Sequence, residues 1–450
     1  MIGQHDTIAA IATPSGTGGV CIIRISGAQA LAIAKQLSKI EDVRKRYAHF
    51  AHFYAQDGSL IDQGILLYFQ APHSFTGEDV VELQGHGGIA VANALLGAAL
   101  DSGARLAEAG EFTRRAFLND KLDLSQAEAV ADLIAARSMA AMQAANRSLQ
   151  GEFSRQVNSL ADEILQLRVY IEAALDFPEE EIDFISEGNI EARLLAWGEK
   201  LSALLQQSEQ GKLLNEGIDL VLAGKPNAGK SSLLNALSGE DRAIVTHIAG
   251  TTRDILRESI IIEGIPINLV DTAGLRESED IVEQEGIRRS HQAIQHAQLI
   301  ALLIAADDMD AAEILDLETQ LRERAGNSPI VKLYNKADLA DASLQAQYQD
   351  GLWLSAKTGQ GLEAVRKKIA QLAGKTESEA PFIARERHIR ALDKAQRHFL
   401  QAWQAFQGHR AAELLAQDLR LVHDDLGEIT GKVHADDLLG EIFSGFCIGK

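Results

Sequence analysis

Apolar residues recur along this chain at two different spacings. In residues 121–214 and 385–450 they return every three or four positions, as in VNSLADEILQLRVYIEAAL and ELLAQDLRLVHDDLGEI, which is the repeat of one face of an α-helix. Proline, which interrupts helices, occurs once in the first stretch, at Pro178, and nowhere in the second. The pattern therefore predicts two helical segments.

Between these segments, from about residue 217 to residue 373, the apolar residues gather in short runs: IDLVLA, SIIIEG, INLVD, LIALLIA, IVKLYN and LWLSA. Such runs, alternating with helical patterns, are typical of a mostly parallel sheet covered by helices. Because the ends of an inserted domain usually lie close together, we expect the two helical segments to form one helical domain into which this α/β domain is inserted.

The first 118 residues differ from both patterns. Four strand-like runs bounded by turn residues, GGVCIIRISG, HFAHFYAQDG, GILLYFQAP and DVVELQGHGG, are mixed with the helical run IAVANALLGAAL, which predicts an α+β domain. The predicted fold class is a multi-domain α+β and α/β protein. Its domains are the N-terminal domain at 1–118, the helical domain at 119–214 and 377–450, and the inserted domain at 215–376.

Composition changes this picture little. Of the 450 residues, 46% are hydrophobic and only 5% aromatic, which fits helices and buried strands better than a β-sandwich. The run LIALLIAA is far shorter than the roughly 20 residues that cross a membrane, and the start of the chain does not resemble a secretory signal. Two cysteines cannot form a disulfide framework, so we expect a cytoplasmic protein with no membrane partner.

The formal net charge of −21 argues against a protein that coats nucleic acid without specificity, because such binding depends on Lys and Arg. Two local basic clusters remain, at Arg44, Lys45 and Arg46 and at Arg385, Arg387 and Arg390. Either these clusters contact RNA or they belong to a solvated face, as most basic triplets do.

The most specific motif is GKPNAGKS, Gly224 to Ser231, which follows the strand IDLVLA and begins the helix SSLLNAL. This is the G-x-x-x-x-G-K-[ST] phosphate-binding loop in its strand, loop and helix context. Its backbone N–H groups and the helix N-terminus bind phosphate oxygens, and Lys230 reaches the β and γ phosphates. Ser231 offers a hydroxyl to Mg²⁺.

Four further motifs follow in the order expected of a GTP-binding domain. GTTRD begins at Gly250 and offers Thr252 to Mg²⁺, and DTAG begins at Asp271, where the strand INLV ends. NKAD begins at Asn335 and SAK begins at Ser355. A carboxylate at Asp338 pairs with N1–H and the 2-amino group of guanine, which adenine lacks, so the predicted ligand is GTP with Mg²⁺.

The residue after DTAG is Leu275, where many GTPases have the glutamine that orients the attacking water. Another group must therefore support hydrolysis. The residues leave two candidates, the carboxylate of Glu283 and an added cation.

Together with SFTGEDVVELQGHGG and the terminal FCIGK, these motifs resemble the MnmE (TrmE) family of bacterial tRNA modification GTPases over essentially the whole chain. The resemblance implies a homodimer with a tetrahydrofolate-binding N-terminal domain, a helical domain and an inserted Ras-like P-loop G domain. It also implies that an FAD-containing partner, MnmG (GidA), acts with it to add an aminomethyl or carboxymethylaminomethyl group to carbon 5 of the wobble uridine of certain tRNAs. A folate derivative, in its 5-formyl or methylene form, is the implied one-carbon source.

The family pattern also assigns the nucleotide and metal sites. K⁺ activates hydrolysis in the family, and its implied ligands here are Asn227, Thr246, Ile248 and Thr251, while Glu283 matches a glutamate that orients water. His247 stands in this loop where an acid is frequent. The implied GTP-binding positions are Asn227, Ala228, Gly229, Lys230, Ser231, Ser232, Thr246, His247, Ile248, Ala249, Gly250, Thr251, Thr252, Asp271, Thr272, Ala273, Gly274, Asn335, Lys336, Asp338, Ser355, Ala356 and Lys357.

In the N-terminal domain the resemblance assigns folate binding to Arg24, Glu82 and Lys121. Without the family each would be as well explained as an ordinary surface charge. At the chain end, Cys447 is the candidate nucleophile or acid of the modification and Lys450 a cofactor-positioning residue, although free cysteines are also often buried for structural reasons. The segment GHGG at Gly85 fits the GxxG of RNA-binding KH domains, but it follows a strand rather than a helix.

A second function class stays open on the motifs alone. A regulatory switch, in which the GTP state controls RNA or ribosome assembly and no substrate is altered, uses the same GTP-binding motifs. It predicts no bound folate, and this separates it from the modification enzyme.

Overall fold

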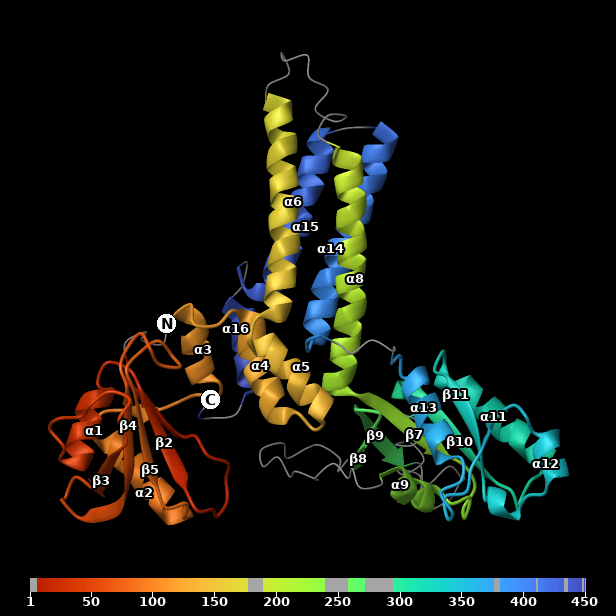
Figure 1. Ribbon diagram of the computed structural model, residues 1–450, viewed down its shortest axis with the longest axis horizontal. Helices are drawn as coiled ribbons and strands as arrows, with labels where there is room; N and C mark the ends of the chain where they lie inside the picture. Colours follow the sequence, from red (N-terminus) through yellow and green to blue (C-terminus); the bar gives the residue numbers. More distant parts are fainter. Residues whose placement is uncertain are drawn as a thin grey trace, which may run out of the picture. The chain divides into compact units, whose positions relative to one another are not determined.

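The chain forms two compact units, each made of segments that are distant in sequence (Figure 1). The first contains Met1–Ala131, Val157–Ala161 and His423–Lys450, and the second contains Asp132–Gln156 and Asp162–Val422. The computed structural model describes residues 6–176, 189–238, 258–271, 294–375, 381–409, 412–432, 436–446 and 449.

The first unit is built on a six-stranded sheet. The strands have the order β3-β4-β5-β2-β1-β6, and every neighbouring pair is antiparallel except β1 and β6. The elements here are β1 (Ile8–Ile11), β2 (Cys21–Ser26), α1 (Ala30–Ser38), β3 (His49–Tyr54), β4 (Leu60–Phe69), β5 (Val80–Gly85), α2 (Ile89–Asp101), β6 (Arg105–Leu106), α3 (Glu111–Leu118), most of α4 (Leu124–Ala135) and α16 (Asp436–Ser444).

Strand β1 is an element that the sequence pattern did not predict. Its residues IAAI show no alternation of apolar and polar positions, because both faces of this strand are covered. Ala9 packs into the core that α1 and α2 form over one face of the sheet, whereas Ile8 and Ala10 pack with Phe112 of α3. A strand buried on both sides loses the period of two by which strands are recognised.

The C-terminal segment packs within the first unit. Leu439, Phe443 and Phe446 join Leu124 and Ala127 in one apolar cluster. Gly449 has φ +96°, and a Cβ at this position would lie 2.3 Å from the carbonyl oxygen of Ile11. The tail therefore runs against the end of β1, while Cys447 and Lys450 lie outside the described residues.

A network of ion pairs joins α3 to the start of the chain. Arg115 pairs with Asp6 at 2.7 Å, with Glu111 at 2.9 Å and with Glu78 at 3.1 Å, and Arg105 pairs with both Asp6 and Glu111 at 2.5 Å. Burial raises the pKa of Glu111, but hydrogen bonds from Arg105, the backbone of Glu108 and Arg115 outweigh burial and lower the pKa below its ordinary value.

We predict that Glu111→Gln lowers the free energy of unfolding by about 3 kcal/mol at pH 7, because it removes the buried carboxylate that both guanidinium groups share and leaves them with fewer negative partners. Since the folded-state pKa of Glu111 is below the ordinary 4.5, this stabilisation is present above pH 4.5 and is lost as the pH falls further. Urea unfolding from pH 7 to pH 3 measures the difference. The control is Glu108→Gln, an exposed carboxylate; equal losses in both variants would contradict the prediction.

The second unit contains a second six-stranded sheet and most of the long helices. The elements are α5 (Met139–Leu149), α6 (Glu152–Asp176), α8 (Ile190–Glu216), β7 (Ile218–Ala223), α9 (Lys230–Ser238), β8 (Glu258–Ile262), β9 (Ile265–Asp271), β10 (Leu299–Ala305), α11 (Ala311–Ala325), β11 (Ile330–Asn335), the 3₁₀ helix η1 (Ala337–Leu339), α12 (Ala342–Gln347), β12 (Leu352–Trp353), α13 (Leu362–Leu372), α14 (Glu386–His409) and α15 (Ala412–Thr430).

The sheet of the second unit has the order β12-β11-β10-β7-β9-β8, and only β8 is antiparallel to its neighbour. Helices cover both faces: Leu220 and Leu222 pack with α9 and α13, whereas Val221 packs with α11. Every residue of β10 is buried. The run LIALLIA is therefore a central strand, and the mostly parallel α/β arrangement predicted from the pattern is confirmed.

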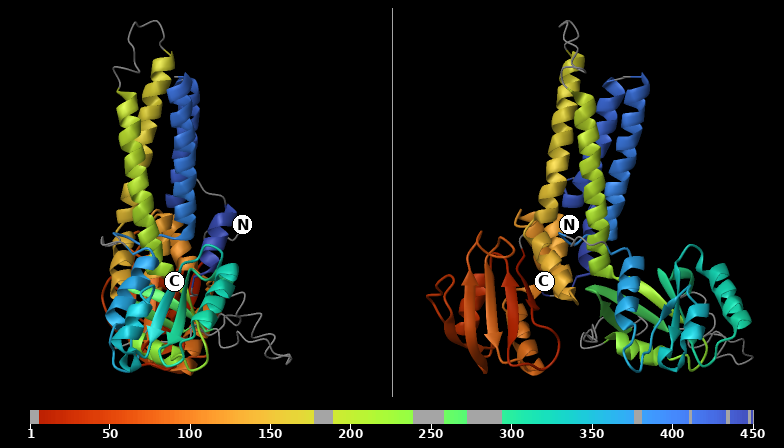
Figure 2. Two further views of the ribbon diagram at one scale, coloured as in Figure 1. Left: turned by 90° about the vertical axis from the view of Figure 1, so that its right-hand side faces the viewer. Right: turned by 45° about the vertical axis from the view of Figure 1, so that its right-hand side comes forward.

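The helices α6, α8, α14 and α15 run alongside one another in all three views (Figures 1 and 2). Gly198 of α8 faces the ring of Phe399 in α14, and the rings of Trp197 and Phe399 lie 4.8 Å apart. The second helical segment thus folds back onto the first, as expected, and α8 passes directly into β7 of the α/β part. The predicted domain boundaries at 118, 214 and 376 stay predictions, since the compact units divide the chain differently.

Residues 381–385, which follow the α/β part in the chain, are held against the helices by polar contacts. Ile383 donates its N–H to the hydroxyl of Ser148 at 2.8 Å, and Arg385 pairs with Asp132 at 2.6 Å. Arg385, one of the basic residues considered for RNA contact, thus has a carboxylate partner within the unit. Across the described ranges, no helix combines the length and the apolar character that crossing a membrane requires.

Candidate functional site

The phosphate-binding loop predicted from GKPNAGKS lies between β7 and α9 in the second unit. Asn227 adopts φ +64° at the turn of the loop. The ammonium of Lys230, the first residue of α9, lies over the loop and donates to the carbonyl oxygens of Gly224 at 2.7 Å and Lys225 at 3.1 Å. The loop, the helix N-terminus and a cation therefore meet at one point, which is the arrangement that binds phosphate oxygens.

Asn335, the first residue of NKAD, joins three of the predicted motifs. Its amide donates to the carbonyl oxygen of Ala228 at 2.8 Å and accepts from the N–H of Ala356 at 3.1 Å. The side chain is only 3% exposed. Gly229 has φ +94°, and a Cβ there would lie 2.3 Å from this amide. The side chain of Asn335 thus holds the phosphate-binding loop against the SAK loop.

We predict that Asn335→Ala lowers the free energy of unfolding by about 1–3 kcal/mol, because a buried carbonyl and a half-buried N–H lose their partner. Nucleotide affinity falls by at least about tenfold in the same variant, since the loop is no longer held. Urea unfolding and titration with a fluorescent GDP analogue measure the two effects. Asn327→Ala, at an exposed position of the same unit, is the control, and an equally stable Asn335→Ala protein would refute the bridging role.

The expected base site lies at the carboxyl ends of β11 and β12. Asp338 is exposed in η1, and the hydrogen bond with the Ser355 side chain is the main cause that lowers the pKa of the Asp338 carboxyl. Ser355 is fully buried, and its hydroxyl also accepts from the N–H of Thr358 at 3.2 Å. An ionised, oriented acceptor at this position suits the two donors of a guanine edge.

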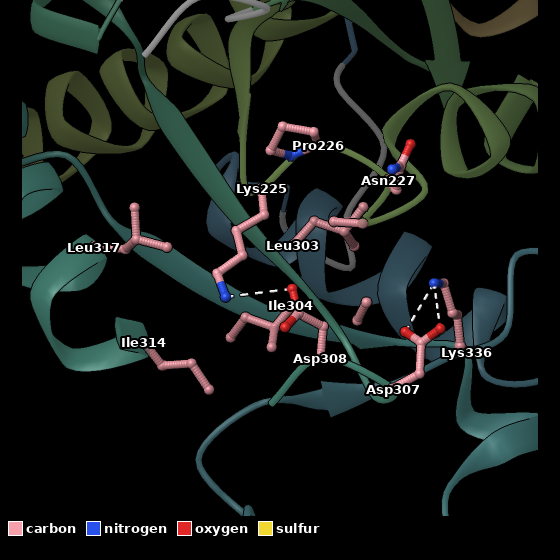
Figure 3. Close-up of a pocket in the computed structure, with 12 residues that line it drawn as sticks. Lys225, Pro226, Asn227, Leu303, Ile304, Asp307, Asp308, Ile314, Leu317 and Lys336 are labelled. Carbon is pink, nitrogen blue, oxygen red and sulfur yellow. Dashed lines mark hydrogen bonds and ion pairs between the residues drawn. The ribbon is translucent and has the colours of Figure 1, made fainter. Parts of the chain in front are cut away.

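A cavity of about 210 Å³ lies beside the phosphate-binding loop (Figure 3). Lys225 points toward Asp308, with 3.3 Å between their charged atoms, and Lys336 pairs with Asp307 at 2.7 Å. Lys225 pairs with both Asp308, which lies between β10 and α11, and Glu313, in the first turn of α11. These contacts fix Lys225 and Lys336 next to the loop. Sequence reasoning missed the two aspartates, because they follow β10 without forming a recognisable motif.

The metal expected with a nucleotide would be held by hydroxyl groups and water rather than by a protein cage. Ser231 is exposed at the start of α9, where Mg²⁺ prefers to keep several of its waters and the phosphate oxygens. In the ranges that the structure describes, no group of three His, Cys, Asp or Glu is placed to bind a metal by itself. Ser231 therefore fits a Mg²⁺ ion that is brought by the nucleotide.

The structure brings together only part of the predicted nucleotide site. Asn227, Ala228, Gly229, Lys230, Ser231, Ser232, Asn335, Lys336, Asp338, Ser355, Ala356 and Lys357 surround the ends of β7, β11 and β12. For Asp271 the backbone ends β9, as the motif requires. Outside the described residues lie Thr246, His247, Ile248, Ala249, Gly250, Thr251, Thr252, Thr272, Ala273, Gly274 and Glu283.

A second candidate site lies in the first unit. Arg24 of β2 and Glu82 of β5 are cross-strand partners, and the guanidinium donates to the carboxylate at 2.9 and 3.1 Å. The rings of Phe75 and Phe112 lie 5.8 and 5.9 Å from the Arg24 guanidinium carbon. Lys121 donates instead to the carbonyl oxygen of Pro72, in the loop that also carries Phe75. A half-buried ion pair whose guanidinium lies near two aromatic rings fits a flat ligand with polar edges.

Comparisons with known proteins extend these observations. Residues 124–447 match the family described as MnmE helical domain, and residues 7–121 match the family described as GTP-binding protein TrmE N-terminus. A protein of Dichelobacter nodosus (strain VCS1703A), named tRNA modification GTPase MnmE, is 63% identical over 450 residues, which cover 99% of each chain. The protein of the same name from Legionella pneumophila (strain Paris) is 50% identical over 446 residues, again 99% of each chain.

A solved structure that resembles part of the chain is the G domain of the T. maritima FeoB iron transporter. It is 28% identical with a TM-score of 0.26, and the match covers 35% of this chain and 98% of that one.

Proposed function

This chain belongs to the MnmE family, and from that premise we propose that it is a GTP-hydrolysing tRNA modification enzyme. The observation that supports this most strongly is the 63% identity to a tRNA modification GTPase over 99% of both chains. The similarity extends to the N-terminal domain, and a protein that acts only as a GTP-dependent switch would not need this domain. A regulatory switch without substrate modification is therefore not favoured.

GTP would bind where the three motifs meet in the second unit. Lys230 and the backbone of Gly229 would hold the phosphates, and Asp338 would accept from the guanine edge while Ser355 orients it. Mg²⁺, held by Ser231 and Thr252 with the phosphates, would neutralise developing charge during hydrolysis. Water attacks the γ-phosphorus, the bond to the oxygen that bridges the β and γ phosphates breaks, and GDP and phosphate leave.

For the hydrolytic step we propose a cation and a carboxylate. K⁺ would be bound by Asn227, Thr246, Ile248 and Thr251, and Glu283 would orient the attacking water. The positive φ of Asn227 supports its part in this set, because it places the residue at the turn of the loop beside Lys230. GTP turnover in equal concentrations of KCl and NaCl tests the cation; equal rates would remove Asn227 from the proposal.

The first unit would supply the one-carbon chemistry. We assign binding of a tetrahydrofolate derivative, in its 5-formyl or methylene form, to Arg24, Glu82, Lys121 and Lys450. The pairing of Arg24 with Glu82 and the two nearby rings support this assignment, since the ligand combines a flat ring with carboxylates. When bound, the folate carries the one-carbon unit, and the protein groups orient it.

The full reaction is proposed to need partners. A homodimer, together with an FAD-containing protein of the MnmG (GidA) kind, would add an aminomethyl or carboxymethylaminomethyl group to carbon 5 of the wobble uridine of certain tRNAs. Because its substrate is tRNA, we place the protein in the cytoplasm.

Mass spectrometry of tRNA nucleosides tests the proposed function. In cells that lack this gene the carbon-5 modification of wobble uridine should be absent, and the wild-type gene should restore it. Calorimetry with a tetrahydrofolate derivative separates the alternative, because a regulatory switch binds none. Unchanged nucleosides in the deletion strain would refute the proposed function.

We also propose that Cys447 acts as the nucleophile or acid of the modification step. Phe446 and Gly449 on either side of it pack within the first unit, against α3 and the end of β1. We predict that Cys447→Ser keeps GTP turnover within about twofold and lowers wobble-uridine modification by at least about a hundredfold, since a hydroxyl is a far weaker nucleophile. Nucleoside mass spectrometry and phosphate release measure the two activities. Full modification by the variant would leave Cys447 a structural role only.

A further inference from the structure

One corner of the first unit, residues 35–54, is richer in positive charge than the rest of residues 1–118. Residues 35–54 contain five Lys or Arg and only two carboxylates, whereas the rest of residues 1–118 contains four Arg and nine Asp or Glu. The five cations are Lys35, Lys39, Arg44, Lys45 and Arg46. They lie on α1 and on the loop that connects it to β3, the edge strand of the sheet (Figure 1).

These cations differ in their contacts from three of the four other arginines of residues 1–118. Arg24, Arg105 and Arg115 are all paired with carboxylates. Within the described residues none of the five cations forms an ion pair. Instead, Arg46 donates to the carbonyl oxygen of His73 at 2.9 Å and Lys45 to the amide oxygen of Gln70 at 3.3 Å. The positive charge of this corner is therefore not neutralised by its neighbours.

Aromatic side chains are interleaved with the charges. The guanidinium of Arg44 lies 3.7 Å from the ring centre of Tyr47, and the ammonium of Lys39 lies 3.7 Å from that of Tyr54. Tyr47 is 47% exposed and Phe50 is 67% exposed. Exposed rings beside unpaired cations are the features by which proteins stack unpaired bases and bind the phosphates between them.

The loop that carries these side chains is held in place. The N–H of Arg46 donates to the carbonyl oxygen of Tyr68 in β4 at 2.8 Å, and the N–H of Arg44 donates to the ring of His49 at 2.9 Å. Val43 is buried in the apolar core between the sheet and its helices. The cations and rings are therefore presented by a supported loop, so little conformational entropy is lost when a ligand binds.

We propose that this corner binds the tRNA substrate. Lys39, Arg44, Lys45 and Arg46 would contact phosphates, and Tyr47 would stack on an unpaired base. The inference rests on the proposed function, which makes tRNA the substrate and assigns Cys447 to the reacting uridine but no residue to the phosphates of the tRNA. The net charge of −21 repels polyanions from most of the surface, so contact with tRNA needs a local positive patch of this kind. An acidic protein surface would be attracted equally by the charges, but it would gain less from the exposed rings.

The test compares two triple variants of the full-length chain that change the net charge equally. In the patch variant, Lys39→Gln, Arg44→Gln and Lys45→Gln remove three cations and leave Arg46 to hold the loop. The control variant carries Arg155→Gln, Lys200→Gln and Lys367→Gln, whose side chains are exposed and paired with carboxylates. Fluorescence anisotropy with end-labelled bacterial tRNA, over a series of KCl concentrations, gives Kd and its salt dependence.

The patch variant should bind tRNA at least about tenfold more weakly at moderate salt. The slope of log Kd against log salt should fall by about two to three, because each lost phosphate contact removes a little under one. The control variant should change neither value appreciably. A further variant, Tyr47→Leu, should weaken binding about fivefold without changing the slope, since stacking does not depend on released counterions.

Several results would overturn the inference. Equal tRNA binding by the patch and control variants would do so. So would a patch variant with unchanged tRNA binding and changed sedimentation, because that result would indicate that the corner binds a protein. Nucleoside mass spectrometry distinguishes this failure from failure of the proposed function. If the wild-type gene and the patch variant restore wobble-uridine modification equally, only the inference is wrong. If the wild-type gene restores none, both are wrong.

Discussion

Lys230→Ala should lower kcat for GTP hydrolysis by about 10²- to 10³-fold, which is the usual cost of removing one donor that stabilises developing charge. The ammonium of Lys230 lies directly over the loop, within hydrogen-bond distance of two loop carbonyl oxygens. From there it can reach the phosphate oxygens on which negative charge accumulates during hydrolysis. Wobble-uridine modification should disappear with the turnover, and this result would show that the modification depends on GTP hydrolysis.

Single-turnover phosphate release measures this effect, and nucleoside mass spectrometry measures the consequence in cells. Lys225→Ala is a matched control from the same loop, because the Lys225 ammonium pairs with the carboxylates of Asp308 and Glu313. It should change kcat by no more than a few fold. Comparable losses in the two variants would show that loop charge in general, rather than the position of Lys230, supports hydrolysis.

Asp338→Asn should weaken GTP binding by at least about a thousandfold, because the two donors of the guanine edge lose the carboxylate that accepts from both. The same variant should gain affinity for xanthosine triphosphate. Xanthine has a carbonyl at carbon 2 where guanine has an amine, and the amide of asparagine can donate to it. The residue is exposed, and an asparagine amide oxygen can still accept from the Ser355 hydroxyl, so fold stability should be little affected.

Competition between fluorescent GDP and unlabelled GTP or xanthosine triphosphate gives both affinities. With an Asp338 pKa below its ordinary value of 3.8, the carboxylate stays ionised as the pH falls from 8 to 5, and GTP affinity of the wild type should not decline through loss of this charge. Asp341→Asn, at the N-cap of α12, is the control. A variant of Asp338 that still prefers GTP would place base recognition elsewhere.

Much of the fold was predictable because its signals are local. Helical and strand-like periods identified the elements of both sheets and the long helices, and turn residues bounded them. Strands β1 and β6 are the exceptions: β6 has only two residues, and β1 is covered on both faces by α-helices and shows no alternation of apolar and polar residues. The order of the five nucleotide motifs could also be predicted, because each motif is a short run of residues that are close together in the chain.

The contacts between these motifs could not be predicted from the sequence. Nothing around Asn335 indicates that its amide lies between Ala228 and Ala356, residues 107 positions before it and 21 after it. Likewise, the pairing of Arg24 with Glu82, 58 residues apart, follows from the register of β2 with β5. The triplet at Arg44 could equally have been a solvated face or one half of a set of ion pairs.

The sequence by itself determined the types of elements, the nucleotide specificity and the family to which the chain belongs. These depend on residue spacing and on side chains that act within one loop. Only the tertiary structure decided which charges are neutralised and which are free to bind a ligand: Arg24, Arg105 and Arg115 meet carboxylates, whereas Arg44, Lys45 and Arg46 meet none among the described residues. The reason is that the neighbours of a charge are set by sheet register and helix packing, which bring together residues that are far apart in the chain.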